Sequence, residues 1–155
     1  MTVKEVIASK ASEAIKFNSE NKSLVYKNSD QEKFIQNTIS LFSTSLISNS
    51  KKKLSDVYCF GLYEGEKIIG LILIDKTGKI LDLAIKDNNN LNTFIKDVAD
   101  ILAKKSIKFI EANVKDDNIA LFNSCGFKSI KFVSNYQTQS IDSSYYFIVR
   151  YNIKN

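Results

Sequence analysis

The stretch at residues 57–85 constrains the fold more than any other part of the chain. Its sequence, VYCFGLYEGEKIIGLILIDKTGKILDLAI, is rich in residues that favour β-strands and contains two turn signals. The turns YEGEK and DKTGK each place a glycine where a hairpin needs a positive φ angle. We therefore predict three antiparallel strands, at about residues 57–63, 67–75 and 79–85.

The sequence that follows predicts a crossover to a parallel strand. The polar loop KDNNNLNT precedes a stretch with helical periodicity, whose apolar stripe is formed by Phe94, Ile95, Val98, Ile101 and Leu102. IKFIEANV, at residues 107–114, predicts another strand. Together they form a βαβ unit, so the strands at 79–85 and 107–114 should be parallel neighbours. Where neighbouring strands change their relation, a sheet can splay and leave a ligand-binding cleft at the strand ends.

Helices are predicted before this sheet. Apolar residues recur at helical spacing between residues 3 and 17, although residues 3–7 could instead form a short strand. SDQE has the form of a capping box, in which Ser29 and Glu32 satisfy the first amides of a helix. The helix that follows has one apolar side and should end near residues 48–50.

The end of the chain predicts a short helix and two strands. Asp116 or Asp117 can cap the helix, and Gly126 can end it in the left-handed conformation. FKSIKFV and SSYYFIVRYNI predict the last two strands. The expected fold is therefore a single α/β domain over residues 1–155, of the α+β kind. It has a mixed, mostly antiparallel sheet of about six or seven strands, a βαβ crossover and flanking helices.

Composition removes several kinds of site from consideration. The chain has no histidine, and histidine is both the commonest general base and the commonest zinc ligand, so we expect no metal site. No apolar run approaches the roughly 20 residues that cross a membrane, and the N-terminus lacks the apolar core of a secretory signal. Cys59 and Cys125 have no paired spacing, which indicates reduced thiols and a cytoplasmic location. The net charge of +5 comes largely from scattered lysines, so nucleic-acid binding is not favoured as the main function.

One short stretch links this order of elements to a known family. In NVKDDNIALFNSCGF, Val114 and Asn118 have the spacing Val-x-x-x-Asn, and Gly126 and Phe127 close the stretch. With the order of elements between residues 57 and 153, these residues resemble the GNAT superfamily of acyl-CoA-dependent N-acyltransferases. The interval from Asn118 to Phe127 is roughly one helical turn shorter than is usual in that family.

The resemblance implies a reaction and a co-substrate. It implies an N-acetyltransferase that moves an acetyl or other acyl group from acetyl-CoA to the amine of a small molecule or a protein. The alternative is a GNAT-fold binding or regulatory module that does not catalyse and whose CoA binding is weakened or lost. The last strand, YYFIVRYNI, could also pair across a homodimer.

The resemblance places the cofactor's diphosphate at the loop after residue 85, where the family has the pattern Arg/Gln-x-x-Gly-x-Gly/Ala. In this chain Asn90 takes the first slot and Thr93 and Ile95 take the glycine slots, so all three depart from the pattern. The asparagines tolerate positive φ angles and could form a substitute nest beside the amides of a helix N-terminus. The candidate cofactor-binding residues are Leu83, Ala84, Ile85, Asn88, Asn89, Asn90, Leu91, Asn92, Thr93, Asn118 and Phe122.

Acyl transfer to an amine also needs acid–base groups. A base must take the amine proton, and Asp82 lies on the strand before the loop, as carboxylate bases do in some relatives. Glu64 in the first hairpin is a second candidate, and either carboxylate could instead be an ordinary polar residue. In the family the oxyanion is stabilised by a backbone N–H of the strand that carries Asp82. Phe122 falls where many relatives have a tyrosine acid, which leaves Cys125 as a candidate acid or as a buried structural cysteine.

Overall fold

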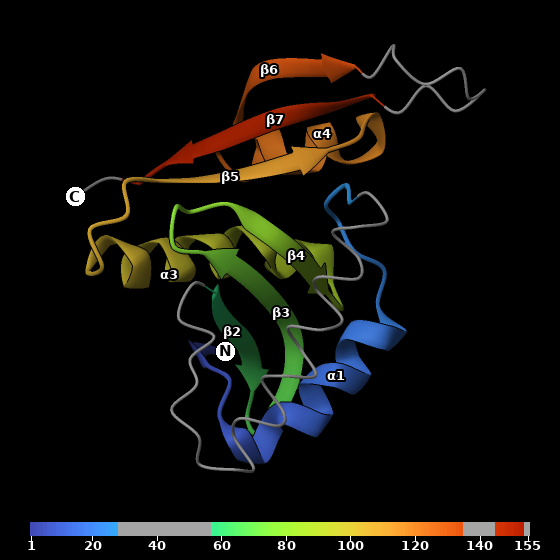
Figure 1. Ribbon diagram of the computed structural model, residues 1–155. Helices are drawn as coiled ribbons and strands as arrows, with labels where there is room; N and C mark the ends of the chain where they lie inside the picture. Colours follow the sequence, from blue (N-terminus) through green and yellow to red (C-terminus); the bar gives the residue numbers. More distant parts are fainter. Residues whose placement is uncertain (28–56, 135–144, 154–155) are drawn as a thin grey trace.

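The computed structural model describes residues 1–27, 57–134 and 145–153. Within these ranges it has seven β-strands, in two sheets, with helices packed on them (Figure 1). The predicted capping box at Ser29 and Glu32, the helix after it and its end near residues 48–50 all lie outside the described residues.

The first sheet contains the predicted three-stranded meander. Its strand order is β1-β2-β3-β4, with β2 at Val57–Glu64, β3 at Lys67–Asp75 and β4 at Ile80–Ile85. All neighbours are antiparallel, so the prediction for residues 57–85 is confirmed. The hairpins turn at Gly65 and Gly78, whose φ angles are 62° and 97°.

The N-terminal segment adds a strand and a helix to this sheet. Strand β1, Thr2–Glu5, pairs with β2, which confirms the alternative of a short strand at the start of the chain. A 3-10 turn, η1 at Ala8–Lys10, leads into α1 at Ala11–Glu20. Ala14 and Phe17 of α1 are buried in a cluster with residues of β2, β3 and β4, so α1 covers one face of the sheet.

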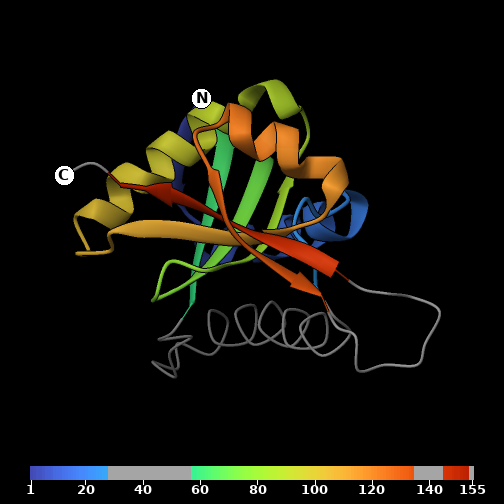
Figure 2. The same ribbon diagram turned by 90° about the horizontal axis from the view of Figure 1, so that it is seen from above.

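The opposite face is covered by α3. After the 3-10 turn η2 at Asn88–Asn90, helix α3 runs over Leu91–Ala103. The stripe predicted for this helix faces the sheet, and Phe94, Ile95 and Val98 are fully buried. Figure 2 shows α3 and α4 on the same side of the strands.

The second sheet is formed by the last three strands. Its order is β5-β7-β6, with β5 at Phe109–Val114, β6 at Lys128–Ser134 and β7 at Tyr145–Asn152, and its neighbours are antiparallel. The sequence predicted one mixed sheet, and the structure has two. They meet at one isolated parallel bridge between Lys79 and Glu111, so β4 and β5 are parallel as predicted but separate beyond it.

Helix α4, Asp116–Ser124, connects the second sheet's β5 to β6. The expectation that Asp116 or Asp117 caps this helix is wrong. The capping residue is Lys115, and both aspartates lie in the first turn, where their charge favours the helix dipole. Gly126 has a φ angle of 95° just beyond the helix, as predicted.

None of the helices in the described ranges combines the length and the apolar character that crossing a membrane requires.

Candidate functional site

The separation of β4 from β5 is the starting point of the site. At the closed end, Glu111 donates its backbone N–H to the Gly78 carbonyl at 2.9 Å. Beyond that point, a segment from the N-terminal part of the chain lies between the two strands. Its Leu24 N–H donates to the Leu83 carbonyl of β4 at 2.8 Å, and its Tyr26 N–H donates to the Asn113 carbonyl of β5 at 2.7 Å. In Figure 1 this blue segment runs beside the ends of both strands.

Asn118 reaches the same segment from α4. Because α4 begins directly after β5, the Val-x-x-x-Asn spacing carries the Asn118 amide to the end of the gap. Its Nδ2 donates to the Leu24 carbonyl at 3.0 Å. We call residues 23–27 the strap. The strap is therefore held by polar groups of β4, β5 and α4, and these include two of the candidate cofactor-binding residues, Leu83 and Asn118.

Asp82 is the buried charge of the site. It is 2% exposed and is the one buried charged residue in the part of the chain that the structure describes. It lies beside an irregularity in the pairing of β3 with β4, where the register shifts between Leu73 and Ile74. Burying a carboxylate costs several kcal/mol of lost hydration, so a buried carboxylate needs hydrogen-bond donors or cations as partners.

Four groups satisfy the Asp82 carboxylate. Oδ2 accepts from Asn18 Nδ2 of α1 at 2.6 Å. Oδ1 accepts from Ser23 Oγ at 2.6 Å and from the Leu83 N–H at 2.9 Å, and Lys27 Nζ lies 3.3 Å from it. Ser23 and Lys27 are strap residues, so the strap holds the candidate base as well as the edge of β4. A backbone N–H of β4 is expected to stabilise the oxyanion. The Leu83 N–H is such a donor, and it is hydrogen-bonded to Asp82.

The side chains of β4 around Asp82 belong to the core. Leu83 and Ile85 are buried in the cluster that contains α3, whereas Ala84 is buried on the α1 face. They can contribute only their backbone to a ligand in the gap, as a cofactor-binding strand would.

The loop between β4 and α3 does not form the predicted nest. In the described ranges the only non-glycine residue with a positive φ angle is Ser106, so none of the asparagines adopts the conformation that the prediction required. Asn88–Asn90 instead form a 3-10 turn. Asp87 Oδ1 accepts from the Asn89 N–H at 2.9 Å, which takes up one amide and places a negative charge where the resemblance predicts the diphosphate.

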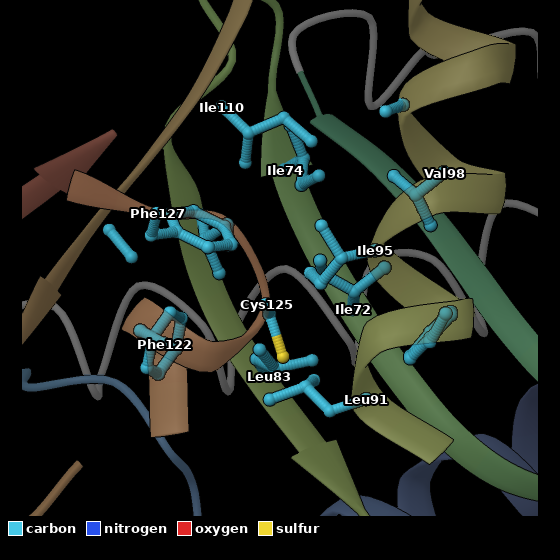
Figure 3. Packing of buried hydrophobic residues seen from close by; sticks show 14 of the residues in the cluster. Ile72, Ile74, Leu83, Leu91, Ile95, Val98, Ile110, Phe122, Cys125 and Phe127 are labelled. Atoms are coloured by element: carbon cyan, nitrogen blue, oxygen red, sulfur yellow. The ribbon is translucent and has the colours of Figure 1, made fainter. Parts of the chain in front are cut away.

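The first turn of α3 has a mixed character. Asn88, Asn89, Asn92 and Thr93 are exposed and Asn90 is half-buried, so five polar candidates stay near solvent. The 3-10 turn runs directly into α3, and Asp87 caps this turn, so a carboxylate already lies at the positive end of the helical run. Leu91 is fully buried. Ile95 lies in the second turn with its side chain in the core beside Ile72 (Figure 3), not beside the loop.

The end of α4 fills the space behind β4 with apolar groups. Phe122, at the position of the family tyrosine, is fully buried and packs edge-to-face on Phe127 with ring centroids 5.1 Å apart. The Cys125 sulfur lies beside Leu83 and Leu91 (Figure 3). Burial raises the pKa of the Cys125 thiol, although a contact with Ser124 opposes the shift. A thiol with a raised pKa gives up its proton less readily, which favours the structural interpretation of this cysteine.

Glu64 lies away from this cluster. It is the exposed last residue of β2 and pairs with Lys67 across the hairpin turn. Strand β3 separates β2 from β4 in the sheet. The structure therefore brings Asp82, Leu83 and Asn118 together around the strap. It places Cys125 in the core on the other face of β4, and it does not bring Glu64 to the site.

Sequence reasoning missed the residues that surround Asp82 and the gap. Asn18 and Ser23 are 64 and 59 positions from Asp82 in the chain. Tyr26 stacks on Tyr146 with ring centroids 5.1 Å apart, and Lys115 Nζ lies 5.0 Å from the Tyr26 ring. No local pattern marks these residues, because each has its partner in a distant element.

The comparisons with known proteins agree with this architecture. No family model and no curated protein sequence matches the chain. Among solved structures, a probable acetyltransferase from Staphylococcus epidermidis is similar at a TM-score of 0.69 and 13% identity, over 99% of each chain. A GNAT-family acetyltransferase from Streptococcus pneumoniae has a TM-score of 0.65 and 13% identity over 99% of each chain. The ribosomal-protein-S18-alanine N-acetyltransferase from Escherichia coli has a TM-score of 0.64 and 15% identity, over 99% of this chain and 94% of that one.

Proposed function

We propose that this chain, which has the GNAT fold, is an N-acyltransferase that moves an acetyl group from acetyl-CoA to an amine. The observation that carries the proposal is the gap between β4 and β5, which holds an extended chain through amide hydrogen bonds. The arm of CoA between its thiol and its diphosphate is also extended and carries two amide groups. The acceptors that hold the strap, the Leu83 and Asn113 carbonyls, and the Asn118 donor suit such an arm.

Asp82 is the residue that we propose as the base. The amine must be neutral when it attacks the thioester, and a carboxylate at the edge of the gap can take its proton. For this role Asp82 must exchange Ser23 and Lys27 for the amine. The Leu83 N–H donates to Asp82, so it would have to leave this carboxylate to stabilise the oxyanion.

The proposed reaction assigns no protein acid to the leaving group. Phe122 has no hydroxyl, and burial raises the pKa of the Cys125 thiol. A free cysteine thiol has a pKa of about 8.5, and a departing thiolate of this weakly basic kind leaves without obligatory protonation. The acceptor class that we propose is an amine of a small molecule or a protein, and the E. coli neighbour acts on an alanine of a ribosomal protein.

The second candidate function is a binding or regulatory module without catalysis. The loop between β4 and α3 favours it, because Asp87 takes the Asn89 amide and adds a negative charge beside the expected diphosphate site. The buried Phe122 favours it as well, since it offers no hydroxyl at the position of the family tyrosine.

Two measurements separate these functions. Acetyl-CoA at 100 times its dissociation constant should stabilise the folded state by about 2.7 kcal/mol, which raises Tm by roughly 5–10 °C for a domain of this size. Asn118→Ala should weaken binding, whereas Asn123→Ala, at an exposed position of the same helix, should not. Transfer is then followed as CoA release with a panel of amines, and Asp82→Asn should slow it far more than it weakens binding.

The outcomes assign the function directly. Binding together with Asp82-dependent CoA release supports the acyltransferase. Binding without release from any amine would replace it by the binding module. The absence of any acetyl-CoA binding would refute the acyltransferase outright.

A further inference from the structure

We propose that the strap, residues 23–27, is an internal competitor that closes the acyl-CoA site and must leave before the cofactor arm can enter. This inference rests on the proposed function and concerns the regulation of the same site. Its basis is that one short segment occupies, at the same time, the groups proposed for cofactor binding and for catalysis.

The strap first occupies the cofactor-binding groups. Leu24 uses its N–H on the Leu83 carbonyl and its own carbonyl on Asn118, and Tyr26 uses its N–H on the Asn113 carbonyl. A second extended chain that made these same hydrogen bonds would have to lie in the space that the strap fills. The cofactor arm and the strap therefore exclude each other.

The strap also occupies the proposed base. Ser23 Oγ lies 2.6 Å from Asp82 Oδ1, and Lys27 Nζ lies 3.3 Å from the same oxygen. The Lys27 side chain is 16% exposed, so most of it is shielded from water while its ammonium group lies at the carboxylate. Withdrawal of the strap would thus open the gap and remove two of the four partners of Asp82 in one step.

The strap can withdraw without breaking a helix or a strand. Residues 21–27 belong to neither, since α1 ends at Glu20. Apart from its polar contacts, the strap is anchored by Val25, which is 7% exposed and packs in the main core, and by Leu24, which packs partly buried against the same core. Tyr26 adds its stacking on Tyr146 and the Lys115 ammonium group over its ring. Segments that lie outside helices and strands and are held by a few side chains can open at a lower free energy than the whole domain.

Closure by the strap should weaken the apparent affinity for the cofactor. A ligand that binds only the open state has an apparent dissociation constant equal to the intrinsic one divided by the open fraction. A substitution that loosens the strap, and leaves the hydrogen-bonding groups of Leu83, Asn113 and Asn118 intact, should therefore tighten acetyl-CoA binding.

Val25→Ser is the variant that tests this, with Val6→Ser as its matched control. Val6 is also a buried valine, 4% exposed, but it packs in a different cluster, with α1 and β2. The free energy gained by burying a valine side chain is large enough to matter here. Its loss from the strap should lower the apparent dissociation constant for acetyl-CoA about tenfold. Val6→Ser should bind acetyl-CoA as the unchanged protein does, although its Tm falls too.

Hydrogen exchange on the unchanged protein provides a second measurement that does not depend on a variant. The amides of Leu24 and Tyr26 should lose protection when acetyl-CoA binds, because their acceptors are then taken by the cofactor. If these amides keep their protection, or if Val25→Ser and Val6→Ser bind alike, the strap is not a competitor and the proposed function stands without it. If none of the three proteins binds acetyl-CoA, the proposed function fails and the strap inference fails with it.

Discussion

The replacement Asp82→Asn tests whether the site is built around a charged carboxylate. The change keeps the size of the side chain and removes its charge. It also replaces one acceptor oxygen by an NH2 group. Every described partner of Asp82 donates a hydrogen bond or is a cation, so this NH2 group would face another donor and form no hydrogen bond with it.

The magnitude follows from burial and from the number of partners. Hydrogen bonds to a charged group contribute about 1.5–3 kcal/mol each, and breaking a buried ion pair costs about 3–5 kcal/mol. The Asn keeps one acceptor, and Lys27, whose side chain is 16% exposed, can turn towards water. We therefore expect a loss near the lower limit, about 3 kcal/mol, which lowers Tm by roughly 6–12 °C.

Urea unfolding measures this loss, and Asp75→Asn is the control. Asp75 Oδ1 also accepts three hydrogen bonds, from Thr77 N, Thr77 Oγ1 and Lys79 N, but it lies half-buried in a hairpin turn. Water can hydrogen-bond there to the donors that lose the carboxylate, so we expect the substitution to lower the free energy of unfolding by less than about 1 kcal/mol. If Asp82→Asn costs no more than Asp75→Asn, the reasoning about a buried and fully partnered carboxylate is refuted.

Two further predictions concern the frame around the site. Gly78→Ala should destabilise the fold by about 3 kcal/mol or more, because its φ angle is 97° and a Cβ would lie 2.1 Å from the Phe109 carbonyl oxygen. Gly65→Ala, at a φ angle of 62° with nothing within 4 Å of the Cβ, should cost only about 1 kcal/mol in the same denaturation assay, and equal losses would contradict the steric argument. Burial raises the pKa of the Cys59 thiol from 9.0 to about 12, so the folded state keeps a proton that the unfolded state releases. The free energy of unfolding should then fall as the pH rises from 9 towards 12, and Cys59→Ser should reduce that fall; an unchanged slope in the variant would argue against a raised pKa of this thiol.

Local sequence was sufficient for most of the elements. The hairpins of residues 57–85 follow from strand-forming residues on both sides of Gly65 and Gly78, and α3 follows from its apolar stripe. These features are encoded within a few positions of each other, so they can be interpreted without the rest of the chain. The errors were also local in kind. An asparagine can adopt a positive φ angle, but residues 88–90 form a 3-10 turn that the Asp87 side chain caps. The capping residue of α4 is one position before Asp116.

The sequence by itself thus determined most of the strands and helices of the described residues, and the resemblance that suggests a ligand site between β4 and β5. Only the tertiary structure decided what fills that gap. The strap contacts Asp82, Leu83, Asn113 and Asn118, which are about 60 to 90 positions away in the chain and lie on three different elements. Contacts between such distant residues depend on how the two sheets and α1 pack together, and no periodicity or spacing within residues 23–27 records them.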